Sequence, residues 1–374
     1  MSIKLLAKGL TSNSLSKKEM FCVCIFAILL LALFDLRVLS SHTWNPHAFI
    51  LERPKDIPAT QTWGVGYDGQ FTYSLATNPW GSVEGLDQPA FRYQRILFPL
   101  LTRILSLNHS LLVPWIMVLI NLAATALVCG ALAYLLKQRG ASPWLSVTVI
   151  FSLGYLLTVR MDLNEPLALG LALLGWVLYE KDKLTLAIIL FALSGLTKEV
   201  GLLFPLSLSL WEALNKNGRR SLALGLGSVA PYIIWYGILF NWFDVSQLQA
   251  DQSRPILIPF WGIKYLKNPY SQLVVGLWVL IPALIAGLLS ALDLWGEKNT
   301  RPGRDALLVL SHIGLIAVLP WPTWEDPIAI LRMGIGLQIT ILVWLAGARP
   351  RLIPYAVALW IPSALLLLFI PNIL

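Results

Sequence analysis

The sequence predicts an all-α polytopic membrane protein, and three observations support that class. Hydrophobic residues make up 57% of the 374 residues, charged residues make up only 13%, and the mean hydropathy is +0.69. Apolar runs long enough to cross a bilayer recur from Met20 to the C-terminus. Basic residues collect in the short polar breaks between these runs. We therefore expect residues 1–374 to form a single membrane domain, built as one helical bundle.

The polar breaks divide the chain into about eleven predicted membrane spans. These are expected near residues 20–40, 111–136, 143–161, 164–180, 184–197, 200–214, 221–242, 272–292, 305–321, 328–347 and 353–371. The fifth and sixth runs are short enough to be re-entrant, and we expect them to form a hairpin with Lys198 and Glu199 at its outer tip. A cleaved signal peptide is an alternative for the first run, because a basic segment precedes it. Its apolar stretch is longer than such peptides usually carry.

Every second polar break is basic, which is the positive-inside pattern of membrane proteins. The basic breaks hold Lys4, Lys8, Lys17 and Lys18, then Lys137 and Arg139, Lys181 and Lys183, Lys216, Arg219 and Arg220, Lys298, Arg301 and Arg304, and Arg349 and Arg351. This pattern predicts a cytoplasmic N-terminus and two extracytoplasmic loops, at residues 41–110 and 243–271. The net charge of +8 is then a topology signal with some attraction for anionic membrane lipids. Nucleic acid is not an expected partner, because no continuous basic face with aromatic residues is present.

Neither a metal site nor a cofactor is predicted. The cysteines Cys22, Cys24 and Cys129 all fall inside apolar runs, and the four histidines show no metal-ligand spacing. No Asp-x-Asp sequence occurs, and Glu325-Asp326 alone would make a poor magnesium site.

The first long loop contains the most informative stretch, Tyr67-Asp68-Gly69-Gln70. A carboxylate next to a glycine in a polar loop is a common surface turn, and that is the alternative to a functional role. The loop closes with a segment in which Arg92 and Arg95 lie on one side and an apolar stripe on the other. We expect that segment to form one amphipathic helix in the outer membrane interface.

Three stretches resemble a known class of membrane enzymes. They are YDGQFTYSLATNP at residues 67–79, FRYQRILFPLL at residues 91–101 and GLTKEVGLLFPLSL at residues 195–208. The first two are similar to the first outer loop of bacterial GT-C-type glycosyltransferases, in families associated with cell-surface glycopolymer formation. A more distant resemblance is to the PIG-V mannosyltransferases, whose loop has a comparable aromatic-Asp-Gly element.

This resemblance implies a multi-pass protein of the bacterial cytoplasmic membrane with an extracytoplasmic active site. It further implies transfer of a sugar from a polyprenyl-phosphate donor to a glycan or lipid acceptor. The local match covers the first long loop, and the hydropathy profile extends it loosely over the whole chain.

The chemistry of such a transfer indicates which side chains to seek. Inverting transfer to a hydroxyl needs a carboxylate that takes the acceptor's proton, and we assign that role to Asp68 because Gly69 permits close backbone approach. Asp35 is a rival, because GT-C enzymes often place their acid just after the first span. The alternative for Asp35 is a structural pairing with Arg37 or another basic group.

Charge that develops on the leaving phosphate needs cations. The candidates are Arg92, Arg95, Lys198 and Arg332. Each has a structural alternative: Arg92 and Arg95 as interfacial groups, Lys198 as part of a solvated tip, and Arg332 as one half of a buried ion pair. The residues assigned to substrate binding are Tyr67, Gln70, Glu199, Trp324, Glu325 and Asp326. The polar cluster of Arg160, Asp162, Asn164 and Glu165 is interpreted as a structural ion-pair network.

Two other functions stay open from the sequence. A transporter or flippase for a lipid-linked glycan would need a polar path through the bundle, and the predicted spans carry little charge. A non-catalytic assembly factor is the third possibility. An enzyme that uses a nucleotide sugar is disfavoured, since the predicted cytoplasmic breaks are short and lack a Gly-rich phosphate loop.

Overall fold

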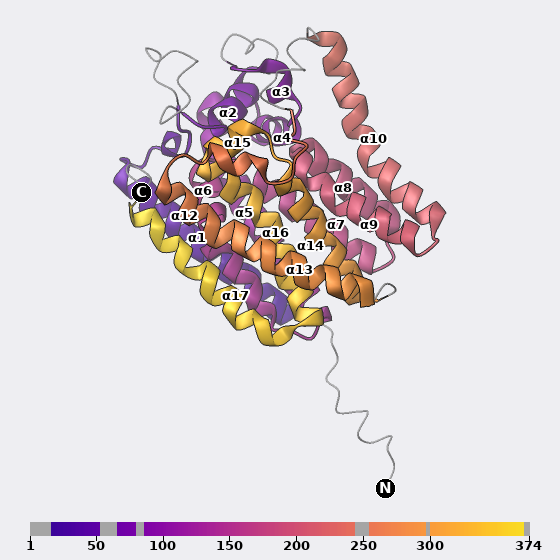
Figure 1. The fold of residues 1–374 in the computed structure, drawn as a ribbon. Helices are drawn as coiled ribbons and strands as arrows, with labels where there is room; N and C mark the ends of the chain where they lie inside the picture. Colours follow the sequence, from indigo (N-terminus) through magenta and orange to yellow (C-terminus); the bar gives the residue numbers. More distant parts are fainter. Residues whose placement is uncertain (1–15, 53–65, 80–85, 244–253, 297–299, 370–374) are drawn as a thin grey trace.

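The computed structural model describes residues 16–52, 66–79, 86–243, 254–296 and 300–369, and over these residues the chain is helical with no strand (Figure 1). Parts of both predicted extracytoplasmic loops, 53–65, 80–85 and 244–253, lie outside the described residues. The prediction of an all-α fold is confirmed.

Long apolar helices form the bundle, and short helices gather at one end of it (Figure 1). The bundle helices are α1 (Lys17–Ser41), α5 (Val113–Gln138), α6 (Leu153–Arg160), α7 (Glu165–Glu180), α8 (Leu184–Thr197), α9 (Leu203–Leu214), α10 (Gly218–Trp242), α12 (Pro269–Val275), α13 (Ile281–Gly296), α14 (Arg301–Ala317), α16 (Pro327–Ala348) and α17 (Ile353–Trp360). Short 3-10 or π segments join or extend them at Pro46–Phe49, Ser110–Leu112, Pro143–Phe151, Glu199–Leu202, Trp261–Tyr265, Gly276–Leu280, Pro350–Leu352 and Ile361–Phe369.

Each of the predicted spans overlaps a helix, but the count of eleven is not confirmed. Six helices of the described residues are long and apolar enough to cross a membrane, and a seventh is counted if the pair Pro143–Phe151 and Leu153–Arg160, bent by 65°, forms one span. The helices α7, α8, α9 and α14 are shorter. At about 1.5 Å per residue, the 14-residue α8 rises only about 21 Å, less than the ~30 Å of a bilayer core. A multi-pass membrane protein fits these helices.

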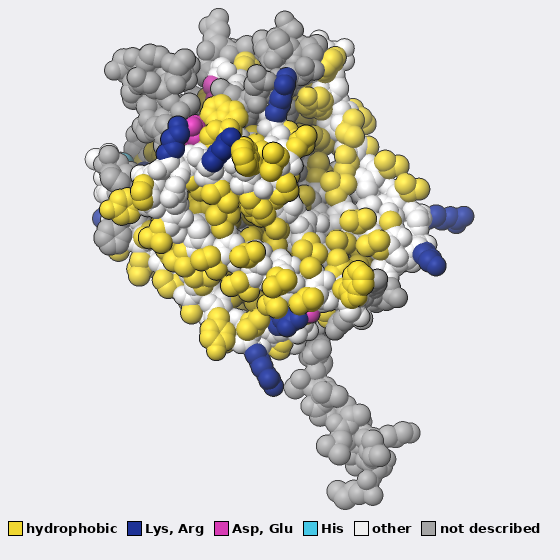
Figure 2. All heavy atoms as spheres, in the orientation of Figure 1, with side chains coloured by type: hydrophobic (Ala, Val, Ile, Leu, Met, Phe, Trp, Pro, Cys, Tyr) yellow, Lys and Arg dark blue, Asp and Glu magenta, His cyan; other side chains and the backbone are white. Residues whose placement is uncertain are grey.

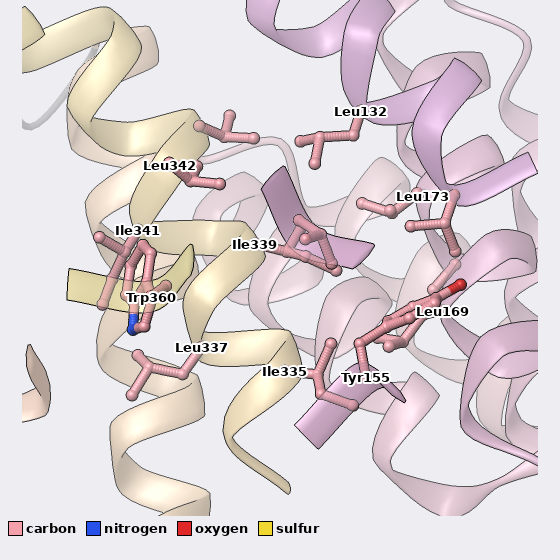
Figure 3. Close-up of a cluster of buried hydrophobic side chains, with 14 of the residues drawn as sticks. Leu132, Tyr155, Leu169, Leu173, Ile335, Leu337, Ile339, Ile341, Leu342 and Trp360 are labelled. Carbon is pink, nitrogen blue, oxygen red and sulfur yellow. The ribbon is translucent and has the colours of Figure 1, made fainter. Parts of the chain in front are cut away.

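The core lies around α16, which runs through the middle of the bundle and is the most buried of the long helices. Its side chains Ile335 and Ile339 face Tyr155 of α6 and Leu169 of α7 in a cluster of buried hydrophobic side chains (Figure 3). The outer helices expose leucines and isoleucines instead, and Figure 2 shows hydrophobic side chains over the middle of one face with Lys and Arg toward its margins. Such a belt suits contact with lipid tails.

The short helices α2 (Gly69–Thr77), α3 (Pro89–Tyr93), α4 (Leu97–Leu105) and α15 (Trp321–Glu325) gather at what we call the site end (Figure 1). The prediction that the segment from Phe91 forms one amphipathic helix is wrong, because the helix is interrupted between α3 and α4. The indole Nε1 of Trp235 donates to the carbonyl of Tyr93, and Pro99 has no N–H to donate to the carbonyl of Arg95. A continuous helix would need both of those carbonyls for its own hydrogen bonds.

The contact between α6 and α16 gives a direct test of this packing. A Cβ on Gly154 would lie 2.4 Å from the backbone oxygen of Leu331, so Gly154→Ala should force the two helices apart. We expect it to cost about 1–3 kcal/mol, seen as a lower melting temperature in detergent. Gly237→Ala in α10 is the matched control, because a Cβ there meets nothing within 4 Å, and it should leave stability equal or slightly higher. Equal melting temperatures for the two variants would contradict the packing.

Candidate functional site

Asp68 lies at the start of α2, where a glycine lets the chain approach the bundle. A Cβ on Gly69 would lie 2.2 Å from the backbone oxygen of Met161, so only glycine allows the first turn of α2 to rest on the α6–α7 turn. In that position the Asp68 carboxylate accepts from Arg92 (Nη1–Oδ1, 2.8 Å) and from Arg332 (Nη2–Oδ2, 3.2 Å). Arg95 approaches the same carboxylate at 3.8 Å. The loop is thereby attached to the bundle through charge.

Arg332 also belongs to a buried ionic group deeper in the bundle. Glu165, the first residue of α7, accepts from Lys198 (Nζ–Oε1, 2.5 Å) and from Arg332 (Nε–Oε1, 2.6 Å). The three side chains are only 1–4% exposed. Lys198 follows α8 and Arg332 lies in α16, so one carboxylate joins three bundle helices. Unpaired charges at this depth would be very costly, and each charge here has a partner.

The arginines of the loop are shared with carboxylates at the rim. Arg92 makes a bidentate pair with Asp87, with both distances 2.8 Å, and its guanidinium lies 4.0 Å from the centre of the Phe71 ring. Arg95 pairs with Glu199 at 2.6 and 3.0 Å. These fork-to-carboxylate contacts fix both guanidinium groups beside Asp68.

A second link joins the loop to the beginning of α16. Asp326 caps α16 by accepting from the Ile328 amide at 2.9 Å, and its other oxygen accepts from the Tyr67 hydroxyl at 2.6 Å. The Arg332 guanidinium lies 4.9 Å from the centre of the Tyr67 ring. Tyr67 therefore connects the loop both to the beginning of α16 and to the guanidinium of Arg332.

These residues surround a pocket with an excess of positive charge. Its wall consists of Asp68, Phe71, Thr72, Leu75, Arg92, Arg95, Leu163, Asn164, Glu165, Lys198 and Arg332. Four of these side chains are cations and two are carboxylates, so the wall carries a net charge of +2. The cavity volume is about 20 Å³, room for about one water molecule, so a larger ligand must displace ion pairs to enter. An anion is the ligand that such a wall favours.

The charge of Asp68 is set by its neighbours. Burial raises the pKa of this carboxyl, but Arg92, Arg332, Arg95 and Lys198 together lower it further, so the pKa lies well below the usual value for aspartate. Asp68 is therefore ionised throughout the physiological range. Because the folded-state pKa is depressed, its ion pairs stabilise the fold at neutral pH. That contribution declines as the pH falls below about 4, the ordinary pKa of aspartate, and is lost when the pH falls below the folded-state pKa.

Most of the candidate residues meet around Asp68, and some do not. The four predicted cations all line the pocket, and Glu199 accepts from Arg95 of its wall. Tyr67, whose hydroxyl donates to Asp326, places its ring against the guanidinium of Arg332. Lys198 is buried, so it is not part of a solvated tip. Gln70 lies in the first turn of α2 outside the pocket wall.

Two candidates at the α15–α16 junction stand apart from the pocket. Trp324 is fully buried against Gly262, where a Cβ would lie 1.9 Å from its ring, so the indole offers no face to a sugar. Glu325 faces Lys267 at 3.8 Å near the surface. The predicted substrate contacts of Trp324 and Glu325 therefore lack a geometric basis.

Sequence reasoning missed Glu165 and Asn164 as site residues. They were grouped with Arg160 and Asp162 as one structural network, whereas the turn between α6 and α7 divides the group: Glu165 faces Arg332, and Asp162 accepts from Asn121. A glutamate that begins an apolar helix was the available signal. Asp35 is buried in α1 and bonds neither to Arg37 nor to any other described group, so its predicted pairing is wrong.

Among the described residues, no group of three or more His, Cys, Asp or Glu side chains has the geometry of a metal site. In comparisons with protein-family models, curated proteins and solved structures, the chain has no match.

The buried ionic group predicts an unequal response to two glutamate substitutions. Glu165→Gln removes the counter-charge shared by Lys198 and Arg332, and we expect it to cost about 3–5 kcal/mol of stability. Glu325→Gln is the matched control, because its partner Lys267 is largely exposed, and it should cost at most about 1 kcal/mol. Thermal unfolding of the purified variants measures the difference. Equal melting temperatures would show that Glu165 does not hold the helices together.

Proposed function

We propose that the protein is a GT-C-like membrane glycosyltransferase that moves a sugar from a polyprenyl-phosphate donor to a glycan or lipid acceptor. The observation that supports this most is the pocket around Asp68, in which two carboxylates, Asp68 and Glu165, and four cations from three chain segments share a wall of net charge +2. A base and an anion site lie side by side, as transfer from a phosphate leaving group requires.

The proposed step is an inverting displacement. The acceptor hydroxyl oxygen forms a bond to the anomeric carbon while the bond between that carbon and the phosphate oxygen breaks. The electron pair of the broken bond leaves with the phosphate, where Arg92, Arg95, Lys198 and Arg332 stabilise it. Asp68 takes the proton of the attacking hydroxyl. Atoms and charges balance without a further reactant.

Binding of the donor would prepare the base. In the described state Asp68 is held by Arg92 and Arg332, which makes its carboxylate a weak proton acceptor. A lipid-linked phosphate would compete for the same guanidinium groups and offset their charge. The pKa of Asp68 would then rise toward the value of a free aspartate, and the carboxylate would become the stronger base when the donor is in position.

The surroundings of the pocket suit a donor with a lipid tail. The site end carries α4, whose Leu100 and Ile104 are exposed, and the bundle below presents a broad apolar surface (Figure 2). We propose that the site end is extracytoplasmic in a bacterial cytoplasmic membrane, since the positive-inside pattern assigns the opposite end to the cytoplasm. That opposite end carries the buried pairs of Arg139 with Asp305 and Glu180.

A transporter, a flippase or a non-catalytic assembly factor for a lipid-linked glycopolymer is the alternative. Transport would need polar groups along a path between the two ends. The side chains of α16 between them, from Ile335 to Leu345, are apolar except for Gln338 and Thr340. This arrangement favours chemistry at one end over passage through the bundle.

The direct test is transfer by the purified protein. It should consume a synthetic polyprenyl-phosphate sugar, and Asp68→Asn should lower the rate about 10²–10⁴-fold at unchanged abundance, because the amide cannot accept the proton. Asp87→Asn is the matched control: it removes another carboxylate bonded to Arg92, at the rim, and should change the rate only a few-fold. Full activity of Asp68→Asn would remove the base from the proposal. Turnover of a nucleotide sugar without any lipid carrier would contradict the donor.

The dependence of the rate on pH provides a second test. In the wild type, kcat/KM should show no loss from protonation of Asp68 between about pH 5 and 8, because its pKa is depressed. Arg92→Ala removes the cation that lowers this pKa most. The acid limb of the pH profile, where kcat/KM falls as Asp68 is protonated, should therefore move to higher pH. Lys267→Ala, an equal charge change on an exposed side chain, should leave the limb in place. Identical limbs in wild type and Arg92→Ala would show that Asp68 does not act as the base.

A further inference from the structure

A second polar cluster lies beside the candidate site and plays no part in the proposed transfer. It consists of Asp35 of α1, Asn121 of α5 and Asp162 of the α6–α7 turn. Asn121 and Asp162 are fully buried, and Asp35 is 5% exposed. The Asn121 amide nitrogen donates to Asp162 Oδ1 at 3.0 Å. Burial and the negative charge of Asp35 both raise the pKa of the Asp162 carboxyl.

The cluster contains four buried oxygens that accept no hydrogen bond from the described residues. They are both carboxylate oxygens of Asp35, Oδ2 of Asp162 and Oδ1 of Asn121. Buried polar atoms are nearly always satisfied, and leaving one unsatisfied costs about 1–3 kcal/mol. Four such acceptors on three separate helices and turns, one of them an uncharged amide, point to a shared electropositive ligand.

The charge of the cluster indicates which ligand. Arg160 is the cation that acts on Asp162, and its guanidinium also donates to the carbonyl of Ala48 at 2.6 Å. With Asp35 and Asp162 ionised, the sum of the two carboxylates and Arg160 is −1. A single positive charge brings the buried group to neutrality, whereas a divalent ion would leave it at +1. Ligands that are all oxygen select a hard cation.

We infer that Asp35, Asp162 and Asn121 form a binding site for a monovalent hard cation, with Na⁺ as the first candidate. The ion would accept electron density from the four unsatisfied oxygens and relieve the repulsion between the two carboxylates. We assign the ion a structural role, because Asp35, Asn121 and Asp162 do not line the pocket around Asp68.

The position of the site explains why an ion there would matter. Asp162 has a left-handed backbone (φ 48°), a conformation that aspartate adopts more readily than most residues. The same turn supplies Leu163, Asn164 and Glu165 to the pocket wall, and the carbonyl of Met161 packs on Gly69. A cation bound to Asp162 would hold this turn, and with it the floor of the pocket. The inference stands whether or not the protein transfers sugar.

The test is thermal unfolding of the purified protein in detergent, with choline chloride, NaCl, KCl, MgCl₂ or CaCl₂ at matched ionic strength. A ligand that binds only the folded state raises Tm, and at about 100 times its Kd the rise should be several degrees. We expect NaCl to raise Tm of the wild type relative to choline chloride. Asp35→Asn and Asp162→Asn, which keep size but remove a charge, should each abolish the rise. Asp68→Asn should retain it, which separates this site from the candidate active site.

Three results would overturn the inference. The first is a wild-type Tm that is the same in NaCl and in choline chloride. The second is a rise that persists unchanged in Asp35→Asn and Asp162→Asn. The third is a rise with Mg²⁺ or Ca²⁺ alone, which would contradict the charge argument. Should either variant fail to fold, equilibrium binding of radioactive ²²Na⁺ to the wild type decides: one ion per chain supports the site, and no binding rejects it.

Discussion

The carboxylate of Glu165 carries the interaction on which the rest of the site depends. It bonds to Lys198 and Arg332 inside an otherwise apolar bundle, and none of the three charges would be stable there alone. Their pairing fixes the beginning of α7, the end of α8 and the second turn of α16 relative to one another. Arg332 then reaches Asp68, so the loop that carries α2 is positioned by the same group.

This arrangement also explains how a weakly basic carboxylate can belong to an active site. Asp68 is paired with Arg92 and Arg332, two of the cations that a bound phosphate would contact under the proposed function. In the described state its carboxylate therefore occupies part of the proposed anion site. Under the proposed function, a lipid-linked phosphate and Asp68 would compete for the same donors, and that competition would couple donor binding to the strength of the base. Under the proposed function, the small cavity volume belongs to the state before the donor enters. Asp162 of the neighbouring cluster directly precedes Leu163, Asn164 and Glu165, which line the pocket.

Much of the fold follows from hydropathy, and the exceptions have physical causes. Every predicted apolar run overlaps a helix, because runs of this length favour helices in a membrane. The number of spans does not follow in the same way, since α8 and α9 are short and the segment before α7 bends by 65° at its break. Composition does not encode such bends. The break between α3 and α4 depends on Trp235, which lies far along the chain and captures a carbonyl there.

The members of the site were predictable by type, and their pairing was not. Arg332 stood out because an arginine within an apolar helix needs a partner, and Asp68 stood out as a carboxylate beside a glycine. That the two meet across 264 positions of sequence is a property of the fold. The sequence does not single out Glu165, because Arg160 and Asp162 lie close to it along the chain and offer a nearer ion pair. Trp324 was assigned to a sugar by residue type, but its ring is needed to pack on Gly262.

The central claim is that the cations around Asp68 form the site of a lipid-linked phosphate. A cryo-EM structure of the protein with a non-hydrolysable polyprenyl phosphonate sugar tests it most directly. We expect the phosphonate within hydrogen-bond distance of at least two of Arg92, Arg95, Lys198 and Arg332, with the contact between Asp68 and Arg332 lengthened or broken and the sugar beside Asp68. A phosphonate bound elsewhere, with the ion pairs of Asp68 unchanged, would contradict the account.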